Sequence, residues 1–171
     1  MPSEIAGLTV PDRPLTDFEE HVYKIAQQLA RRDPEQETWD IDIAALNLTF
    51  HSASRNPAEI TFLLTIAPEH TNVLGNLHGG CAATIFDILS SMILLGASKP
   101  GVFEFGGVSR HLDVTYLRPV PVGTTVKLVS RMVHMGKRLA LMRSEIVRVD
   151  DGAVCIVSDH EKANTDPEVK L

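Results

Sequence analysis

The order of apolar and polar positions predicts a helix, two strands, a second helix and four further strands. The first helix is predicted over residues 16–32, where apolar side chains recur three and four positions apart: Phe18, Val22, Ile25, Ala26 and Leu29. Thr16 and Glu19 fit a capping box at its start, and Pro34 ends it. We expect this amphipathic helix to pack against the main domain.

Segments with alternating or β-branched residues, bounded by turn residues, predict the strands. They cover residues 45–54, 59–67, 108–117, 124–135, 139–149 and 153–162. Asp151 and Gly152 indicate a hairpin turn between the last two. Along 108–117 the alternation predicts one face with Val108, Arg110, Leu112, Val114 and Tyr116, and the opposite face with Ser109, His111, Asp113 and Thr115.

Residues 79–97 form a long apolar segment that approaches the length of a membrane-spanning helix, roughly 20 residues. Asp87 lies at its midpoint, and a charge there costs about 2.5–3.5 kcal/mol in a bilayer. We therefore interpret the segment as a helix buried in a soluble fold. Because it is apolar nearly all round, it must be covered nearly all round, and the sheet is the material available. The predicted fold class is α+β, an antiparallel sheet wrapped around a long central helix.

Composition favours a single soluble domain. The chain has 171 residues, a hydrophobic fraction of 44%, a formal net charge of −6 and a mean hydropathy of +0.03. The acidic balance argues against a broad nucleic-acid surface, which needs clustered positive charge. Cys81 and Cys155 lie in apolar segments and are expected to be reduced, buried thiols.

We divide the chain into an N-terminal arm and amphipathic helix (1–40), the main domain (41–165) and a C-terminal tail (166–171). Residues 1–14 contain prolines and no periodicity, so we expect a loose arm. The N-terminus lacks a basic region followed by an apolar segment, so neither a secretory signal nor a transit peptide is expected. We expect a cytoplasmic location, with mitochondrial association left open.

Two features of the apolar helix suggest chemistry. His78, Gly79 and Gly80 lie at its start, where free N–H groups and the helix dipole can polarise a carbonyl, although a tight turn would also need glycine. Asp87 has apolar neighbours on both sides, which favours a carboxylate in a cleft, acting as general base or nucleophile, over one satisfied by a neighbouring side chain. His70 and His78 match no familiar zinc spacing, so no metal site is expected.

Several of these residues together resemble a known family. They are Asn72, the run 75–80, Asp87, Ser109 and the segments 114–119 and 135–140. In this combination the sequence resembles the hotdog-fold thioesterase superfamily, and within it the branch of acyl-CoA thioesterase 13 and the phenylacetate-pathway thioesterases. The similarity covers approximately residues 45–163. The resemblance implies a hotdog fold, which agrees with the wrapped helix predicted from the pattern.

The resemblance also implies an activity, the hydrolysis of a fatty or aromatic acyl-CoA to free acid and CoA. Asp87 matches the family's catalytic carboxylate, a general base on water or, less favoured, a nucleophile, and Ser109 would hold that water. The Gly79 backbone N–H would polarise the thioester carbonyl, with His78 supporting its loop. Asn72 would orient water or the carbonyl. In the family two subunits share the site, with Asp87 and Ser109 facing Asn72 and Gly79, so a homodimer is implied and a homotetramer is usual.

The same resemblance implies where the CoA part of the substrate binds. The turn of Gly136, Lys137 and Arg138 matches the segment that contacts the pantetheine and phosphates in the family, and such a turn suits phosphate. Charged residues that solvate a hairpin would give the same pattern. Further candidate substrate-binding residues are Gly80, His111, Tyr116, Arg118 and His134. No cofactor is implied, because CoA is part of the substrate.

Two alternatives stay open at this point. A hotdog hydratase or dehydratase would pair a catalytic His with an acid on the helix, but here His78 precedes the glycines and the acid is Asp87 rather than Glu, which favours hydrolysis. A non-catalytic hotdog module would bind CoA esters without turnover. The long N-terminal extension and the insert-like segment 103–107 leave the acyl group undefined. The sequence distinguishes neither CoA from carrier-protein thioesters nor a dimer from a tetramer.

Overall fold

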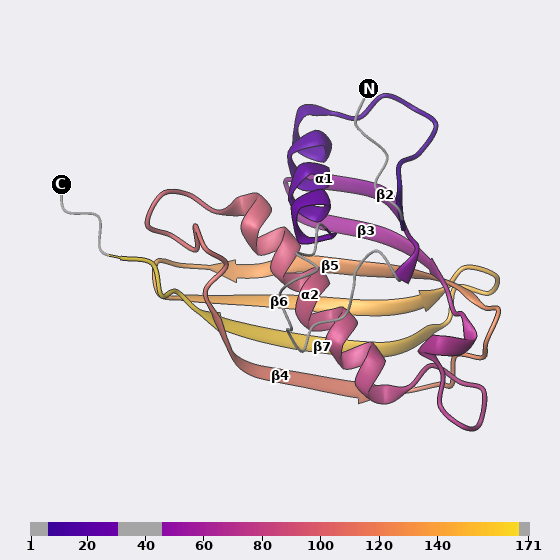
Figure 1. Cartoon of the computed structure of the whole chain (residues 1–171). Helices are drawn as coiled ribbons and strands as arrows, with labels where there is room; N and C mark the ends of the chain where they lie inside the picture. The colour runs from indigo at the N-terminus through magenta and orange to yellow at the C-terminus, as the bar shows by residue number, and fades with distance from the viewer. Residues whose placement is uncertain (1–6, 31–45, 168–171) are drawn as a thin grey trace, which may run out of the picture.

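The computed structural model describes residues 7–30 and 46–167. Within them, a seven-stranded sheet has the order β1-β2-β3-β5-β6-β7-β4, and α1 (Asp17–Ala30) and α2 (Gly79–Ala97) lie on one face of it (Figure 1). The strands are β1 (Leu8–Thr9), β2 (Leu48–Arg55), β3 (Ala58–Thr65), β4 (Val108–Tyr116), β5 (Thr125–Met135), β6 (Leu139–Arg148) and β7 (Val154–Ala163). Neighbouring strands are antiparallel, except that β1 and β2 run parallel.

The predicted α+β class, with a sheet around a long central helix, is confirmed. The central helix has the predicted bounds, because the apolar run is delimited by glycines before it and by Pro100 after it. Each of the six predicted strands is present, with ends that differ by up to three residues. The largest difference is at β2, which begins at Leu48, whereas the prediction began at residue 45, outside the described residues.

Helix α2 crosses the inner face of the sheet diagonally (Figure 1). Its large apolar side chains, among them Ile85, Phe86 and Leu89, are buried. The covering is less complete than predicted: a strip of α2 is only half-buried, because one curved sheet reaches only one side of a helix. This open strip consists of Ala83, Thr84, Asp87, Ile88 and Ser91. Among the described residues α2 is long and apolar enough to span a membrane by length and composition, and 50% of its most apolar stretch is buried within the molecule.

Helix α1 packs against α2 and β2, as its apolar face predicts. The predicted capping box is present: Glu19 N–H donates to Thr16 Oγ1 (3.3 Å), and Thr16 N–H donates to the Glu19 carboxylate (2.9 Å). Val22 of α1 packs closely against Gly96 of α2, where an added Cβ would lie only 3.0 Å from a Val22 methyl. The predicted end of the helix, at residue 32 before Pro34, lies outside the described residues.

The expectation of a loose arm over residues 1–14 is wrong for Leu8 and Thr9, which form β1 beside β2. Leu8 is buried in the core, and burial of a leucine side chain offsets the cost of ordering a short segment. Arg13 adds a second anchor through a bidentate ion pair with Glu19 of α1. Residues 1–6, and the predicted domain boundary between 40 and 41, lie outside the described residues.

The predicted faces of β4 are wrong at its start, because a β-bulge interrupts the pairing with β7. Ser109 lies opposite Lys162 and His111 lies opposite Glu161, so Arg110 is the extra residue. One extra residue shifts the alternation by one position. Ser109 therefore faces α2, on the same side of the sheet as Leu112, instead of pointing away with His111.

Candidate active site

Asp87 lies at the centre of a hydrogen-bonded network that joins α2, β4 and β7. Its carboxylate is 48% exposed in the single chain. Ser109 Oγ, turned inward by the bulge, donates to Asp87 Oδ1 over 3.0 Å. His160 on β7 lies behind both, with Nε2 at 2.8 Å from Ser109 Oγ and 3.4 Å from Asp87 Oδ1. The predicted pair Asp87 and Ser109 is thus joined by a histidine that the sequence analysis did not single out.

The chemistry of this network fixes the direction of its hydrogen bonds. An ionised carboxylate only accepts, so Ser109 must donate to Asp87 and accept from the Nε2–H of His160. Nδ1 of His160 then carries no hydrogen and accepts from Ser90 Oγ at 2.6 Å. The opposite tautomer would set a lone pair of Nε2 against Asp87 Oδ1. The favoured arrangement runs from Ser90 through His160 and Ser109 to the carboxylate.

His160 is completely buried, and this sets its charge. Desolvation lowers its pKa to about 4, aided by the nearby Lys162 ammonium and opposed by the Asp87 carboxylate. At neutral pH the ring is therefore uncharged and donates a hydrogen bond without adding a positive charge. A neutral donor holds Ser109 in place and leaves the carboxylate of Asp87 able to accept a proton.

A second connection reaches Asp87 from β7 by way of its backbone. Lys162 is 7% exposed, and its Nζ donates to Ser91 Oγ over 2.8 Å. Ser91 Oγ in turn donates to the carbonyl oxygen of Asp87 over 2.7 Å. Burial lowers the pKa of Lys162, and the negative charge of Asp87 acts in the opposite direction. Asp87 is therefore linked to β7 twice: its carboxylate through Ser109 to the neutral His160, and its backbone carbonyl through Ser91 to the cationic Lys162.

The other predicted residues of the reaction lie at the N-terminus of α2. His78 is the N-cap, and its Nδ1 accepts the N–H of Gly80 at 3.0 Å. Tyr116 on β4 packs over Gly79 and donates its hydroxyl to the Gly79 carbonyl at 2.7 Å. A Cβ on Gly79 would lie 3.2 Å from that hydroxyl, and one on Gly80 would lie 3.2 Å from the His78 ring. Close approach explains both glycines, since neither has a positive φ.

Asn72 shapes the loop that leads into α2. Its Oδ1 accepts the N–H groups of Leu74 (2.9 Å) and Asn76 (3.3 Å), which leaves Nδ2 as the group available to a ligand. Asn72 and Gly79 line one pocket of about 380 Å³. The complete lining is Asn72, Asn76, Leu77, Gly79, Tyr116, Leu117, Arg118, Pro119, Val120 and Ile156. Four residues predicted from the sequence therefore share this pocket, which we call the Gly79 pocket.

A third group of predicted residues occupies the turn between β5 and β6. Lys137 and Arg138 are exposed there, and the ring of His134 lies against Gly136, where a Cβ would be 3.1 Å from Nε2. Asn164 fixes the turn by donating its side-chain N–H to the carbonyl of Lys137 at 3.0 Å. The turn therefore presents two cations from a fixed backbone.

Other basic residues of this region have carboxylate partners. Arg131 pairs with Glu59 and Glu145, Arg143 with Asp159, and Arg148 with Asp151. His111, a predicted binding residue, is exposed beyond the bulge and faces away from Ser109. Arg118 donates to the carbonyl of Val154 at 2.7 Å at the edge of the Gly79 pocket.

The two histidines weighed as metal ligands have local partners instead. His70 is buried in a short 3₁₀ turn (Pro68–His70) and accepts the N–H of Ala67 through Nδ1, while His78 caps α2. Over residues 7–30 and 46–167, no group of three or more His, Cys, Asp or Glu side chains could hold a metal ion. Cys155 is buried as predicted, Cys81 is half-buried, and burial raises the pKa of both thiols.

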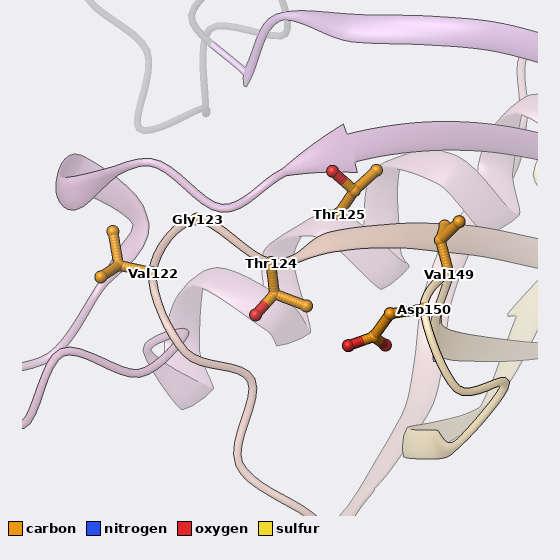
Figure 2. A pocket seen from close by; sticks show the side chains of 6 residues that line it. All are labelled: Val122, Gly123, Thr124, Thr125, Val149 and Asp150. Atoms are coloured by element: carbon orange, nitrogen blue, oxygen red, sulfur yellow. The ribbon is translucent and has the colours of Figure 1, made fainter.

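A second pocket, of about 490 Å³, lies at the start of β5, at the other end of this strand from the turn with Lys137 and Arg138 (Figure 2). It is lined by Val122, Gly123, Thr124, Thr125, Val149 and Asp150. Thr124 and Asp150 are both among its lining residues (Figure 2). None of the site residues predicted from the sequence lines this second pocket, whereas four of them line the Gly79 pocket.

With this geometry described, the chain can be compared with known proteins. Residues 74–155 match the family model of the thioesterase superfamily, a range that includes Gly79, Asp87 and Ser109. Over this range the chain is similar to the thioesterase superfamily. Human acyl-coenzyme A thioesterase 13 is 29% identical over 109 residues, which cover 64% of this chain and 75% of that protein.

Solved structures agree on the fold of the thioesterase domain. Thioesterase superfamily member 2 from Mus musculus superposes with a TM-score of 0.70 at 23% identity, covering 87% of this chain and 98% of that one. The PaaI protein of the E. coli phenylacetic acid degradation operon superposes with a TM-score of 0.69 at 16% identity, covering 90% and 100%. The predicted resemblance to hotdog thioesterases is confirmed.

Sequence reasoning missed two residues of the thioesterase domain that contact the Asp87 network, His160 and Lys162. Both follow Ile156 and Ser158 on the inward face of β7, so that this face changes from apolar to polar along the strand. That change was a usable signal, because an inward-facing Lys needs a partner. The alternation of the segment predicts a strand, but it does not by itself indicate which face is turned inward.

Proposed function

We propose that this chain is an acyl-CoA thioesterase that hydrolyses fatty or aromatic acyl-CoA to the free acid and CoA. The observation that carries the proposal is the half-exposed Asp87 carboxylate, held by hydrogen-bond donors from Ser109 and, through it, His160. A half-exposed carboxylate with one oxygen held by a hydrogen bond suits the activation of water. Similarity to the thioesterase superfamily and the name of the human relative, acyl-coenzyme A thioesterase 13, support the substrate class.

In this proposal Asp87 acts as a general base. Its Oδ1 accepts from Ser109, and among the described residues no side chain hydrogen-bonds Oδ2. Oδ2 is then the oxygen that takes a proton from water. To hold that water, Ser109 Oγ would exchange one of its present hydrogen bonds for a hydrogen bond to the water. The water oxygen bonds to the thioester carbon, the C–S bond breaks, and the CoA sulfur leaves as a thiolate that takes up a proton.

The Gly79 pocket is proposed to hold the thioester carbonyl. The N–H groups of the first helical turn have no partner within the helix, and the positive end of the helix dipole lies there. The N–H of Gly79 would donate to the carbonyl oxygen, whose charge grows as water attacks. Nδ2 of Asn72 lines the same pocket and would be the second donor. His78, as N-cap, keeps this first turn in place.

We further propose that two copies of the chain complete each site. Gly79 and Asp87 lie eight residues apart on α2, about 12 Å along its axis, which is too far for both to reach one thioester carbon. A twofold axis near Ala83, halfway between them, would bring Gly79 of one copy beside Asp87 of the other. The half-buried strip of α2 and the free edge of β4 offer the surface for that contact.

The remaining parts of the proposal concern CoA, assembly and location. Lys137 and Arg138 have no carboxylate partner among the described residues, so both cations are available to CoA phosphates. Pairing of two dimers into a tetramer and a reaction without a cofactor are proposed on the resemblance to hotdog thioesterases. A cytoplasmic location is proposed from the two free cysteines.

The test is release of the CoA thiol from a panel of short, medium and long fatty acyl-CoAs and phenylacetyl-CoA. Asp87→Asn keeps the shape of the side chain but removes the base, and we expect it to lower kcat about 10³-fold. Asp12→Asn changes an exposed Asp ahead of α1 and serves as the matched control, with full activity expected. If the wild type binds CoA esters but turns none over, the chain is a binding module; full activity of Asp87→Asn would remove Asp87 as the base.

A further inference from the structure

Lys162 is a buried cation that the reaction described above does not use. It is 7% exposed, on the inward face of β7, directly opposite Ser109 of β4. Burying an ammonium group away from water is costly unless an opposite charge or several hydrogen bonds compensate. The one hydrogen bond from its Nζ goes to Ser91 Oγ, a neutral acceptor. Within the described part of the chain no carboxylate lies within the 4.0 Å of a salt bridge with Lys162.

The charged groups around Asp87 can be counted element by element. Helix α2 carries no other charged residue over its whole length. Strand β4 contributes the neutral Ser109, and β7 contributes His160, which is uncharged at neutral pH, and Lys162. The inner faces of β5 and β6 at this level carry serine and methionine side chains. Lys162 is therefore the one cation that the described elements packed around Asp87 bring next to it, linked through Ser91.

The Lys162 ammonium has its largest effect on the Asp87 carboxylate when the site is closed, that is, when water is excluded from it. The carboxylate is half-exposed in the single chain, and a bound acyl-CoA or a second copy would remove that water. Loss of water disfavours the ionised form of a carboxylate, and a general base must be ionised. A buried ammonium that does not move compensates for the lost water, and Lys162 is held in place by Ser91.

We propose that Lys162 is a positioning residue whose buried ammonium serves as the counter-ion of Asp87 and keeps it in the ionised, base-competent form in the closed site. Ser91 links the two residues physically, since it accepts from Lys162 and donates to the Asp87 carbonyl. The inference rests on the proposed function for its catalytic meaning, whereas the coupling between the two charges can be tested without turnover.

The first arm of the experiment measures the pH dependence of kcat for Lys162→Met, which keeps the length of the side chain and removes its charge. We expect the acidic limb of the profile to move to higher pH by about one pH unit, with KM little changed, because an opposite charge nearby favours the ionised carboxylate. Lys162→Arg, which restores a cation, should return the limb towards its wild-type position. Lys127→Met removes an exposed lysine of β5 and should leave the profile unchanged.

The second arm measures the titration of the Lys162 amine by NMR in the wild type and in Asp87→Asn, with the signal assigned from its absence in Lys162→Arg. Coupling of two charges is reciprocal, so removing the Asp87 charge should lower the midpoint of the lysine titration by about one pH unit. An unchanged midpoint overturns the proposal whatever the activity of the chain. A lowered midpoint in a chain that hydrolyses no thioester supports the coupling and refutes the proposed function, so the two failures are distinguishable.

Discussion

The Asp87 network and the Gly79 pocket lie on the same helix, eight residues apart, but they are built in different ways. The network joins three elements that are distant in sequence, through hydrogen bonds between Asp87 of α2, Ser109 of β4 and His160 of β7. The pocket is lined by two continuous stretches, residues 72–79 and 116–120, together with Ile156 of β7. The network depends on contacts between single residues of distant elements, while the pocket is lined mainly by two short segments at the start of α2 and the end of β4.

The difference indicates how the work of a thioesterase would be divided. The proton acceptor has to keep its orientation, and hydrogen bonds from β4, supported by β7, supply it. The group that polarises the carbonyl has to admit a large substrate, and an open pocket at a helix end does so with a backbone donor of the first helical turn. Neither region can act on a thioester alone, since about 12 Å separates them along α2.

The largest expected effect comes from separating the two regions altogether. Ala83→Arg places a long charged side chain in the open strip of α2, where the single chain has room for it. If two copies share each site, the variant should sediment as a monomer and lose about 10²–10³-fold in kcat/KM, because the carbonyl loses its donor. Val149→Arg, at an exposed turn far from the strip, is the matched control. A fully active Ala83→Arg monomer would contradict the shared site.

An intermediate effect should follow from weakening the network without touching Asp87. Ser109→Ala should lower kcat about 10–100-fold, and His160→Asn about 10-fold, since Asn cannot reach Ser109 as Nε2 does. The double variant should be little worse than Ser109→Ala, because both changes remove one connected unit. His160→Gln, which places a donor near the position of Nε2, should restore part of the activity. Additive losses in the double variant would show that His160 acts separately from Ser109.

The same histidine gives this prediction a stability signature. Its pKa is about 4 in the folded chain and about 6.5 when unfolded, so between these values the unfolded state binds more protons. The contribution of neutral His160 to stability is therefore complete above pH 6.5 and is lost as the pH falls towards 4, an effect on the order of 2–3 kcal/mol. Denaturant unfolding at several pH values should show this loss in the wild type and a smaller one in His160→Gln.

The smallest effect is expected in the pocket. Tyr116→Phe removes the hydroxyl that donates to the Gly79 carbonyl and leaves the ring in place. One neutral hydrogen bond contributes about 0.5–1.5 kcal/mol, so kcat/KM should fall about 2–10-fold. Tyr23→Phe is a matched control, since its hydroxyl also donates to a backbone carbonyl, that of Leu8, far from the pocket. Equal effects of the two substitutions on kcat/KM would mean that Tyr116 acts only through stability.

Much of the fold could be predicted because its elements have strong local signals. The bounds of α2 follow from an apolar run between a glycine pair and a proline, and the hairpins follow from their turn residues. The capping box of Thr16 and Glu19 was also visible in the sequence. β1 was not, because two residues form no pattern and its stability comes from burying Leu8.

The candidate site was only partly predictable, for a reason that particular residues make clear. Asp87 and Gly79 could be selected because an acid in an apolar helix and glycines at a helix start are unusual locally. The face of Ser109 depended on a bulge, which is a property of the pairing between two strands. His160 and Lys162 depended on which face of β7 meets α2. Residues whose roles arise from contacts between distant segments are hard to recognise in a single sequence, because no local pattern marks them.

The β-bulge at Arg110 has a consequence for how this chain could change over evolution. Ser109 faces Asp87 because the bulge places Arg110 between Ser109 and His111 without adding a pairing position on β7. If the bulge were lost while Arg110 stayed, regular alternation would put Ser109 on the same face as His111 and turn it to solvent. A deletion of Arg110 would instead leave a regular strand in which Ser109 stands two positions before Leu112 and still faces α2. In relatives of this protein, a gap of one position at the bulge is therefore compatible with the same chemistry.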